Sequence, residues 1–302
     1  MQRVKAVIRR LLAIDPRRNR TQANLIFSFD SRTKKIGIQD RGGYQTRNVS
    51  TTHLLLEAAH AVREQLAKTF SVDIFTGDLV VDPPSRPHFA YCAAIDQPQT
   101  VMIPDFVFWG WPQVGIDDYE ATRQAILQAA RREPEDPRLF WIGNPKTHLI
   151  RERFLELAAN DDRIHAGGLR WTSGTVGQGS RRLQAEGAAF VSLADHCRYR
   201  YLIDLEGAGY SGRLKLLLFA GRPLFIQTRR WREFFFDGLV PFEHYIPVKE
   251  DLSDLSSQID WAEANPQSAA AIARQGQEFA IGHLCRRHAV ERLSQCLLAL
   301  AH

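Results

Sequence analysis

Short apolar runs and one longer helical stripe alternate in the first part of the chain. Residues 25–29, 35–39 and 72–76 are apolar runs of the length that β-strands favour. Between them, apolar side chains recur every three or four residues from about 51 to 69, which predicts an amphipathic helix. Another helix is expected over about residues 117–132. This part of the chain therefore predicts a mixed α/β unit.

After residue 137 the alternation of strands and helices becomes more regular. Strands are predicted at residues 138–142, 189–193, 201–205 and 223–227, and helices at residues 148–159, 211–219, 252–265 and 268–298, the last with a break. Such alternation is typical of βαβ units with parallel strands. We therefore expect a second α/β domain that faces the first across a cleft.

The segment between the two halves marks the expected domain boundary. Residues 133–137 hold two prolines and three acidic residues, which cannot continue a helix. We expect an N-terminal, acceptor-side domain over residues 1–135 and a second domain over 136–285. Residues 286–302 are expected to form a helix that packs back on the first domain.

The composition is that of an ordinary globular protein and excludes several classes. Of 302 residues, 44% are hydrophobic and 24% charged, and 39 basic against 34 acidic residues leave a net charge of +5. This profile excludes collagen, long coiled coils and disordered chains. No run approaches the about 20 apolar residues of a membrane span. The four cysteines lack C-x-x-C spacing, which argues against a zinc site or a disulfide-stapled domain and favours the cytoplasm.

The N-terminal segment has a basic, amphipathic pattern. Apolar residues at 4, 7, 8, 11 and 12 share one helical face, and arginines and a lysine flank them. Two interpretations stay open: a helix packed on the protein, or a helix lying on an anionic membrane surface. The second would place the protein peripherally at the inner membrane. Nucleic acid is not an expected partner, because no aromatic-rich basic stripe follows.

A glycine-rich turn between a predicted strand and helix is the sharpest local feature. Gly207, Gly209 and Gly212 have the G-x-G-x-x-G spacing of dinucleotide-binding turns. However, the next strand ends in residues 228–230, Thr-Arg-Arg, where that fold carries an acidic residue for the ribose. Backbone amides of the turn can still bind a phosphate, and Arg213 at the helix start would be favoured by an anion in front of it.

Other residues fit anion or sugar binding. Gly143 and Asn144 form a second strand-to-helix turn, with Arg151 further along that helix. Trp109 and Trp111 belong to an aromatic cluster on which a sugar ring could stack, and core packing is the alternative. No D-x-D pair or spaced histidines and cysteines indicate a metal site.

Five segments between residues 193 and 255 together resemble one known family. They read DHCRYRYL from Asp195, GAGYSGRLK from Gly207, EFF from Glu233, HYIPV from His244 and DLSDL from Asp251. Their order and spacing resemble glycosyltransferase family 90, which includes fungal capsule-associated proteins, animal protein O-glucosyltransferases (Rumi) and bacterial lipopolysaccharide glycosyltransferases. The resemblance is strong over about residues 138–285 and faint before them.

The resemblance implies a fold, a reaction and a set of residues. The fold would be GT-B-like, with two Rossmann-like α/β domains facing each other across a cleft. The reaction would be inverting, metal-independent transfer of a hexose or pentose from UDP to a hydroxyl of a glycan such as lipopolysaccharide core or capsule. Asp78 would be the base, with Asp82 as its competitor. The donor nucleotide would be bound by Gly143, Asn144, Arg151, Gly209, Tyr210, Ser211, Gly212 and Arg213.

The remaining expectations concern partners and alternatives. Trp109 and Trp111 are the expected sugar contacts on the acceptor side, and the acceptor would be lipid-linked. The UDP-sugar is a co-substrate, and no further cofactor is expected. A catalytically inactive nucleotide- or carbohydrate-binding module and a nicotinamide-dependent oxidoreductase remain as alternatives.

Overall fold

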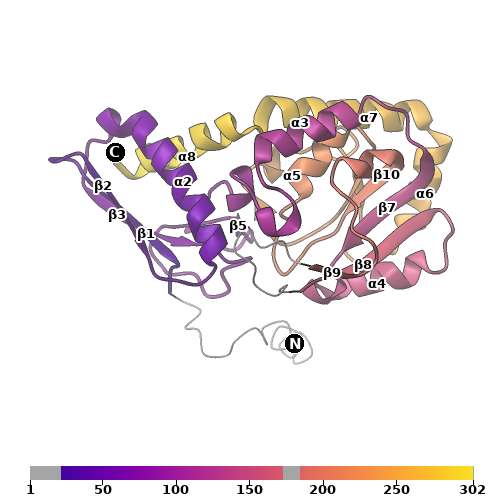
Figure 1. The fold of residues 1–302 in the computed structure, drawn as a ribbon, viewed down its shortest axis with the longest axis horizontal. Helices are drawn as coiled ribbons and strands as arrows, with labels where there is room; N and C mark the ends of the chain where they lie inside the picture. Colours follow the sequence, from indigo (N-terminus) through magenta and orange to yellow (C-terminus); the bar gives the residue numbers. More distant parts are fainter. Residues whose placement is uncertain (1–21, 173–183, 302) are drawn as a thin grey trace.

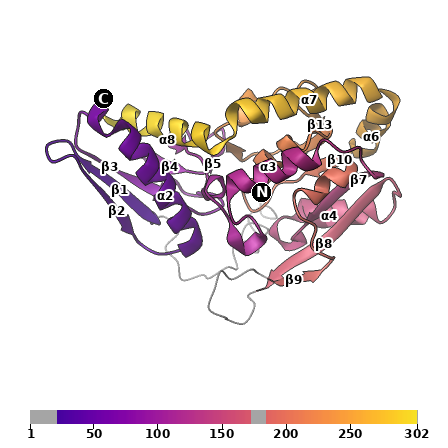
Figure 2. The ribbon, with the colours of Figure 1, turned by 45° about the horizontal axis from the view of Figure 1, so that its top comes forward.

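The computed structural model describes residues 22–172 and 184–301, which form two α/β units side by side (Figures 1 and 2). The basic helix predicted from residue 4 to 12 lies outside the described residues. Within the described ranges, no helix has the length and apolar character that a membrane span requires.

The N-terminal unit is built on a five-stranded sheet of mixed direction, in the order β2-β1-β3-β4-β6. The strands are β1 (Leu25–Asp30), β2 (Lys35–Asp40), β3 (Phe70–Phe75), β4 (His88–Ala90) and β6 (Thr100–Met102). β1 pairs antiparallel with β2 and β3, whereas β3, β4 and β6 run parallel. Alternate residues of β1 are buried, and they share a core with α2 (Gln45–Val62) on one face of the sheet.

The C-terminal helices tie the two units together. Helix α7 (Pro266–His283) lies on the second unit, and α8 (Arg286–Ala301) returns to the first (Figure 2). Leu293 and Leu297 share the core of α2, and the Ser294 hydroxyl donates to the carbonyl oxygen of Ala58 at 3.1 Å. A two-stranded ribbon, β5 (Cys92–Ala93) with β12 (Arg232–Glu233), adds a second link between the units.

The second unit carries a six-stranded sheet in the order β13-β11-β10-β7-β8-β9. Its strands are β7 (Asp136–Gly143), β8 (Ile164–Thr172), β9 (Gln184–Gly187), β10 (Tyr199–Asp204), β11 (Leu224–Gln227) and β13 (Ile246–Val248). All pairs are parallel except β8 with β9. The helices are α4 (Leu149–Ala158), α5 (Leu214–Leu217) and α6 (Leu255–Ala264), besides α7. Helix α3 (Tyr119–Ala129), expected in the first domain, lies at the junction and packs on both units. Residues 139–142 of β7 are all buried, as expected for a strand covered on both faces.

The predicted α/β class and the GT-B-like pair of α/β units are confirmed. The first sheet departs from an all-parallel Rossmann pattern because β1 and β2 form a hairpin. The prediction of a strand at residues 189–193 is wrong. This segment has no regular secondary structure, and its side chains form part of a pocket wall. The helix predicted at residues 211–219 is reduced to α5 and a following 3₁₀ turn. Residues 136 and 137, expected in a linker, already belong to β7.

Candidate active site

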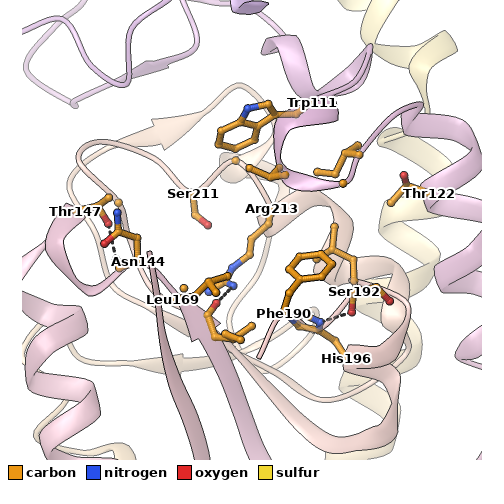
Figure 3. A pocket seen from close by; sticks show the side chains of 18 of the residues that line it. Trp111, Thr122, Asn144, Thr147, Leu169, Phe190, Ser192, His196, Ser211 and Arg213 are labelled. Carbon is orange, nitrogen blue, oxygen red and sulfur yellow. Dashed lines mark hydrogen bonds between the residues drawn. The ribbon is translucent and has the colours of Figure 1, made fainter. Parts of the chain in front are cut away.

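A pocket of about 630 Å³ lies between the two units, within the size range of small-molecule sites. It opens beyond the carboxyl ends of β3, β7 and β10, which is where parallel α/β sheets bind their ligands. In Figure 3, Arg213 projects into the centre, with Asn144 and Thr147 to one side and Phe190 and His196 to the other.

The structure brings Asp78 to this pocket and leaves Asp82 outside it. Asp78 follows the end of β3 by three residues, and its side chain is 40% exposed. Arg47 of α2 forms an ion pair with it, Nη1 to Oδ1 at 2.9 Å. Asp82 is exposed and does not line the pocket. Of the two carboxylates, only Asp78 therefore faces the space that a substrate would occupy.

Polar contacts fix the turn that carries Asp78. The Thr76 amide donates to Asn24 Oδ1 at 2.9 Å, and the Thr76 hydroxyl donates to Asn48 Oδ1 at 2.6 Å. The Cys92 thiol donates to the carbonyl oxygen of Asp78 at 3.1 Å. The position of the turn is thus set by side chains from three other segments.

Gly209 has a role that the sequence did not indicate. A Cβ atom at this position would lie 2.0 Å from the carbonyl oxygen of Asp78, so only glycine permits this approach. Gly209 itself is not part of the pocket lining, whereas Tyr210, Ser211 and Gly212 are. The glycine-rich turn of the second unit therefore rests directly on the backbone of Asp78.

Arg213 occupies the floor of the pocket. Its Nη1 donates to the carbonyl oxygen of Ile142, and its Nε lies 3.6 Å from Asp204 Oδ1. Its Nη2 is buried and has no hydrogen-bond partner among the described residues. Burial lowers the pKa of Arg213, although the carboxylate of Asp204 acts in the opposite direction. The expected anion in front of Arg213 is thus partly provided by the protein itself.

One buried carboxylate serves several groups on this floor. Asp204 has no exposed side-chain surface, accepts from the Ser211 hydroxyl at 2.6 Å and pairs with Arg229 Nη1 at 2.8 Å. Arg213 also lies beside Asp204, and Arg151 interacts with it electrostatically. A second buried carboxylate, Glu206, interacts with Arg151 and Arg229. Burial and the charge of Arg213 lower the pKa of Arg151. The local balance of charge is therefore positive.

Arg151 is held by the protein backbone. Its Nε donates to the carbonyl oxygen of Glu206, its Nη1 to that of Asn144 and its Nη2 to that of Leu205, at 2.8, 3.2 and 3.1 Å. Asn144 and Gly143 line the pocket beside it. Arg151 thus joins the two turns that were predicted to bind the donor, and adds its charge to the floor.

The two tryptophans predicted as sugar contacts are separated by the structure. Trp111 lines the pocket and lies at its upper side in Figure 3. Trp109 is not among the lining residues, because its ring stacks on His53 at 4.6 Å and is faced by the guanidinium of Arg286 at 4.7 Å. Of these two tryptophans, Trp111 alone is placed to contact a sugar bound in the pocket.

His196 lines the pocket, although the sequence did not place it among the candidate site residues. Its Nδ1 lies 2.7 Å from the carbonyl oxygen of Ser192, so Nδ1 carries the proton and Nε2 is an acceptor. Nε2 is buried and has no partner in the part of the chain that the structure describes. Burial, and then the charge of Arg213, lower the pKa of His196 to about 3, so the ring is neutral at neutral pH.

A buried charged triad joins the two units behind the pocket. Lys215 Nζ lies 3.0 Å from Asp105 Oδ2 and 2.8 Å from Glu233 Oε1, and none of its side chain is exposed. Burial alone would lower the pKa of Lys215, but the two carboxylates raise it. Burial also raises the pKa of Glu233. The sequence placed Lys215 and Glu233 in family motifs but gave neither a role, and it did not single out Asp105, because the three residues are far apart in the chain.

Residues 22–172 and 184–301 contain no group of three or more histidine, cysteine, aspartate or glutamate side chains that could hold a metal ion. Metal independence remains a prediction, which the chelator experiment below addresses.

The family described as glycosyl transferase family 90 matches residues 76–296, which is more than half of the chain. The match includes Asp78, both glycine turns and the triad. The chain belongs to this family of glycosyltransferases.

Several curated relatives are named as O-glucosyltransferases. Protein O-glucosyltransferase 1 of Rattus norvegicus is 29% identical over 216 residues, covering 67% of this chain and 53% of that protein. The same-named protein of Mus musculus is 27% identical over 256 residues, which cover 80% of this chain and 63% of that protein. The O-glucosyltransferase rumi homolog of Anopheles gambiae is 31% identical over 195 residues, which cover 61% of this chain and 48% of that protein. The chain thus spans about half to two-thirds of the length of these relatives.

The solved structures that match are more distant. Anabaena Alr3699/HepE in complex with UDP-glucose is 11% identical, with a TM-score of 0.37, and the match covers 63% of this chain and 46% of that one. A sucrose-phosphate synthase from Thermosynechococcus elongatus is 15% identical, with a TM-score of 0.34, covering 58% and 40%. At these scores the likeness says nothing about the ligand of this chain.

Proposed function

We propose that this protein transfers a sugar from a nucleoside diphosphate, with UDP as the first candidate, to an acceptor hydroxyl, with inversion and without a metal ion. The observation that carries the proposal is the surplus of buried positive charge on the pocket floor. Arg151, Arg213 and Arg229 outnumber the two buried carboxylates near them, Asp204 and Glu206. Nη2 of Arg213 has no partner among the described residues. A diphosphate would balance this charge and accept that free N–H.

The proposed reaction uses groups from both sides of the pocket. Asp78 accepts the proton of the acceptor hydroxyl while the hydroxyl oxygen attacks the anomeric carbon. The bond from that carbon to the diphosphate breaks, and its electron pair leaves with the diphosphate. Attack opposite the leaving group inverts the configuration. Arg213 and the amides of the Ser211–Gly212 turn stabilise the charge that develops, in place of a metal ion.

Two acceptor classes follow from different observations. The basic pattern at residues 4–12 supports a lipid-linked glycan, such as lipopolysaccharide core or capsule, reached from the cytoplasmic side of the inner membrane. The names of the relatives from rat, mouse and mosquito support a protein hydroxyl, with glucose as the transferred sugar. Trp111 offers an aromatic face to a sugar in either case.

Calorimetric titration with UDP, with and without a chelator, tests the donor site. We expect chelator-insensitive binding that Arg213→Ala weakens about 10- to 100-fold, because a hydrogen bond to a charged group contributes about 1.5–3 kcal/mol. The matched control is Arg198→Ala, an exposed arginine paired with Glu135 outside the pocket. Unchanged UDP affinity in Arg213→Ala would remove Arg213 from the donor site.

Further titrations and transfer assays separate the alternatives. Binding of a nicotinamide cofactor but not of UDP would favour an oxidoreductase, and UDP binding without transfer would favour a binding module. With active enzyme, a screen of UDP-sugars against core oligosaccharide and against a serine-bearing protein domain distinguishes the two acceptor classes.

A further inference from the structure

Arg47 is a largely buried arginine near the start of α2, and it lines the pocket on the side of Asp78. The centre of its guanidinium group lies 4.5 Å from the ring centroid of Tyr44 and 5.1 Å from that of Phe106. Only 13% of its side chain is exposed. Aromatic contacts of this kind restrict a guanidinium group that would otherwise sample many rotamers.

The guanidinium group is directed at the turn that carries the proposed base. Nη1 of Arg47 lies 2.9 Å from Asp78 Oδ1 and donates to the carbonyl oxygen of Thr76 at 3.3 Å. The next residue of α2, Asn48, accepts from the Thr76 hydroxyl. The first turn of α2 thus holds both the backbone of the turn and the carboxylate at its end.

The ion pair joins Nη1 of Arg47 to one carboxylate oxygen of Asp78, Oδ1. The Asp78 side chain is 40% exposed and lines the pocket, so the carboxylate can be reached from the cavity. In Arg213, by contrast, the buried Nη2 has no hydrogen-bond partner among the described residues. The two arginines are therefore arranged for different tasks: Arg213 toward a ligand, and Arg47 toward a protein carboxylate.

We propose that Arg47 is a positioning residue, which holds the Asp78 carboxylate so that Oδ2 faces the acceptor hydroxyl. This inference rests on the proposed transferase function. During transfer, Oδ2 takes the hydroxyl proton, the hydroxyl oxygen bonds to the anomeric carbon and the diphosphate leaves with the electron pair of the broken bond. Arg47 keeps its own protons throughout and acts only through Asp78.

The test compares kcat with UDP affinity in Arg47→Gln. We expect kcat to fall about 100-fold, since a small displacement of a reacting group has effects of that order. The Kd of UDP should change less than twofold, and the binding stoichiometry should stay at one. Arg47→Lys should recover part of kcat, because it restores the charge but not the planar group.

Arg86→Gln is the matched control for this substitution. Arg86 forms an ion pair with Asp73 of β3, the strand that precedes Asp78, but the Arg86 side chain is 71% exposed and does not line the pocket. Its kcat should equal that of the wild type. A loss of UDP affinity in Arg47→Gln as large as in Arg213→Ala would assign Arg47 to the donor site and overturn the inference, as would an unchanged kcat.

Two further results keep the test decisive. If Arg47→Gln does not fold, Arg47→Lys decides: reduced kcat with unchanged UDP affinity supports the inference, and full activity assigns Arg47 to folding alone. If wild type transfers no sugar, the proposed function fails. If wild type transfers sugar and Asp78→Asn keeps its turnover, the function stands, but the base assignment and the role of Arg47 are wrong. If Asp78→Asn loses its turnover and Arg47→Gln is fully active, only the role of Arg47 is wrong.

Discussion

The donor side and the base side of the pocket are built in different ways. On the donor side, most of the residues come from one stretch of chain that begins at the end of β10, and Ser211, Arg213 and Arg229 each contact Asp204. Arg151 and the turn at Gly143 come from a second stretch. On the base side, Asp78 is held by residues from α2, from the segment before β1 and from β5. A contiguous stretch can be recognised as a motif, whereas a site collected from distant segments cannot.

The two central carboxylates also differ in exposure, and their proposed tasks explain why. Asp204 has no exposed side-chain surface and faces arginines and a hydroxyl, so its charge stays balanced inside the protein. Asp78 is 40% exposed and pairs with one arginine through one oxygen. A structural carboxylate benefits from full pairing, while a base must reach a substrate proton.

Asp78→Asn tests the base side and has the largest expected effect. An amide cannot accept the hydroxyl proton as a carboxylate does, so turnover should fall about 1,000-fold or more. UDP binding should persist, because the donor side is untouched. Initial rates of sugar transfer and calorimetry measure the two quantities. Asp82→Asn is the control and should keep full turnover; a reversal of the two results would move the base to Asp82.

Lys215→Met tests the junction between the two sides. It leaves the carboxylates of Asp105 and Glu233 buried without their cation, which should lower the free energy of unfolding by about 3–5 kcal/mol. Urea denaturation measures this change. The control is Lys146→Met, whose exposed pair with Glu152 should contribute less than about 1 kcal/mol. Equal effects of the two substitutions would show that the triad contributes no more than a surface pair.

The pH dependence of stability tests the donor side and has the smallest expected effect. The pKa of His196 is about 3 in the folded protein, below the value of about 6.5 expected when unfolded. Between pH 6.5 and 3, His196 is therefore protonated in the unfolded state but not in the folded state. The free energy of unfolding falls as the pH decreases from 6.5 toward 3. The expected loss is about 1.4 kcal/mol per pH unit below 6.5.

Thermal denaturation from pH 7 to 5 in wild type and His196→Gln isolates this contribution. The variant should lose less stability on acidification than the wild type, because its amide does not titrate. His60→Gln removes an exposed histidine and should follow the wild type. Burial raises the pKa of Glu206 and Glu233. Acidification therefore stabilises the folded state through these two carboxyl groups, and it does so equally in the wild type and both variants. Parallel curves for wild type and His196→Gln would contradict the prediction.

The sequence by itself determined the α/β class, most helices and strands, and the family. Periodicity reports which face of a segment is buried, so the strand predicted at 201–205 and the helix predicted from 51 agree with β10 and α2. The segments between residues 193 and 255 are contiguous, so their order could be read directly. The same reasoning failed at residues 189–193, because an apolar run looks alike in a strand and in a pocket wall.

Only the tertiary structure decided how the site is assembled. It placed Asp78 rather than Asp82 at the pocket, retained Trp111 and excluded Trp109, and brought Arg47 to the proposed base. It also assigned Gly209 to a contact with the backbone of Asp78, where local rules had indicated a phosphate. Each of these facts depends on which distant segments meet, and periodicity and local spacing contain no information about that.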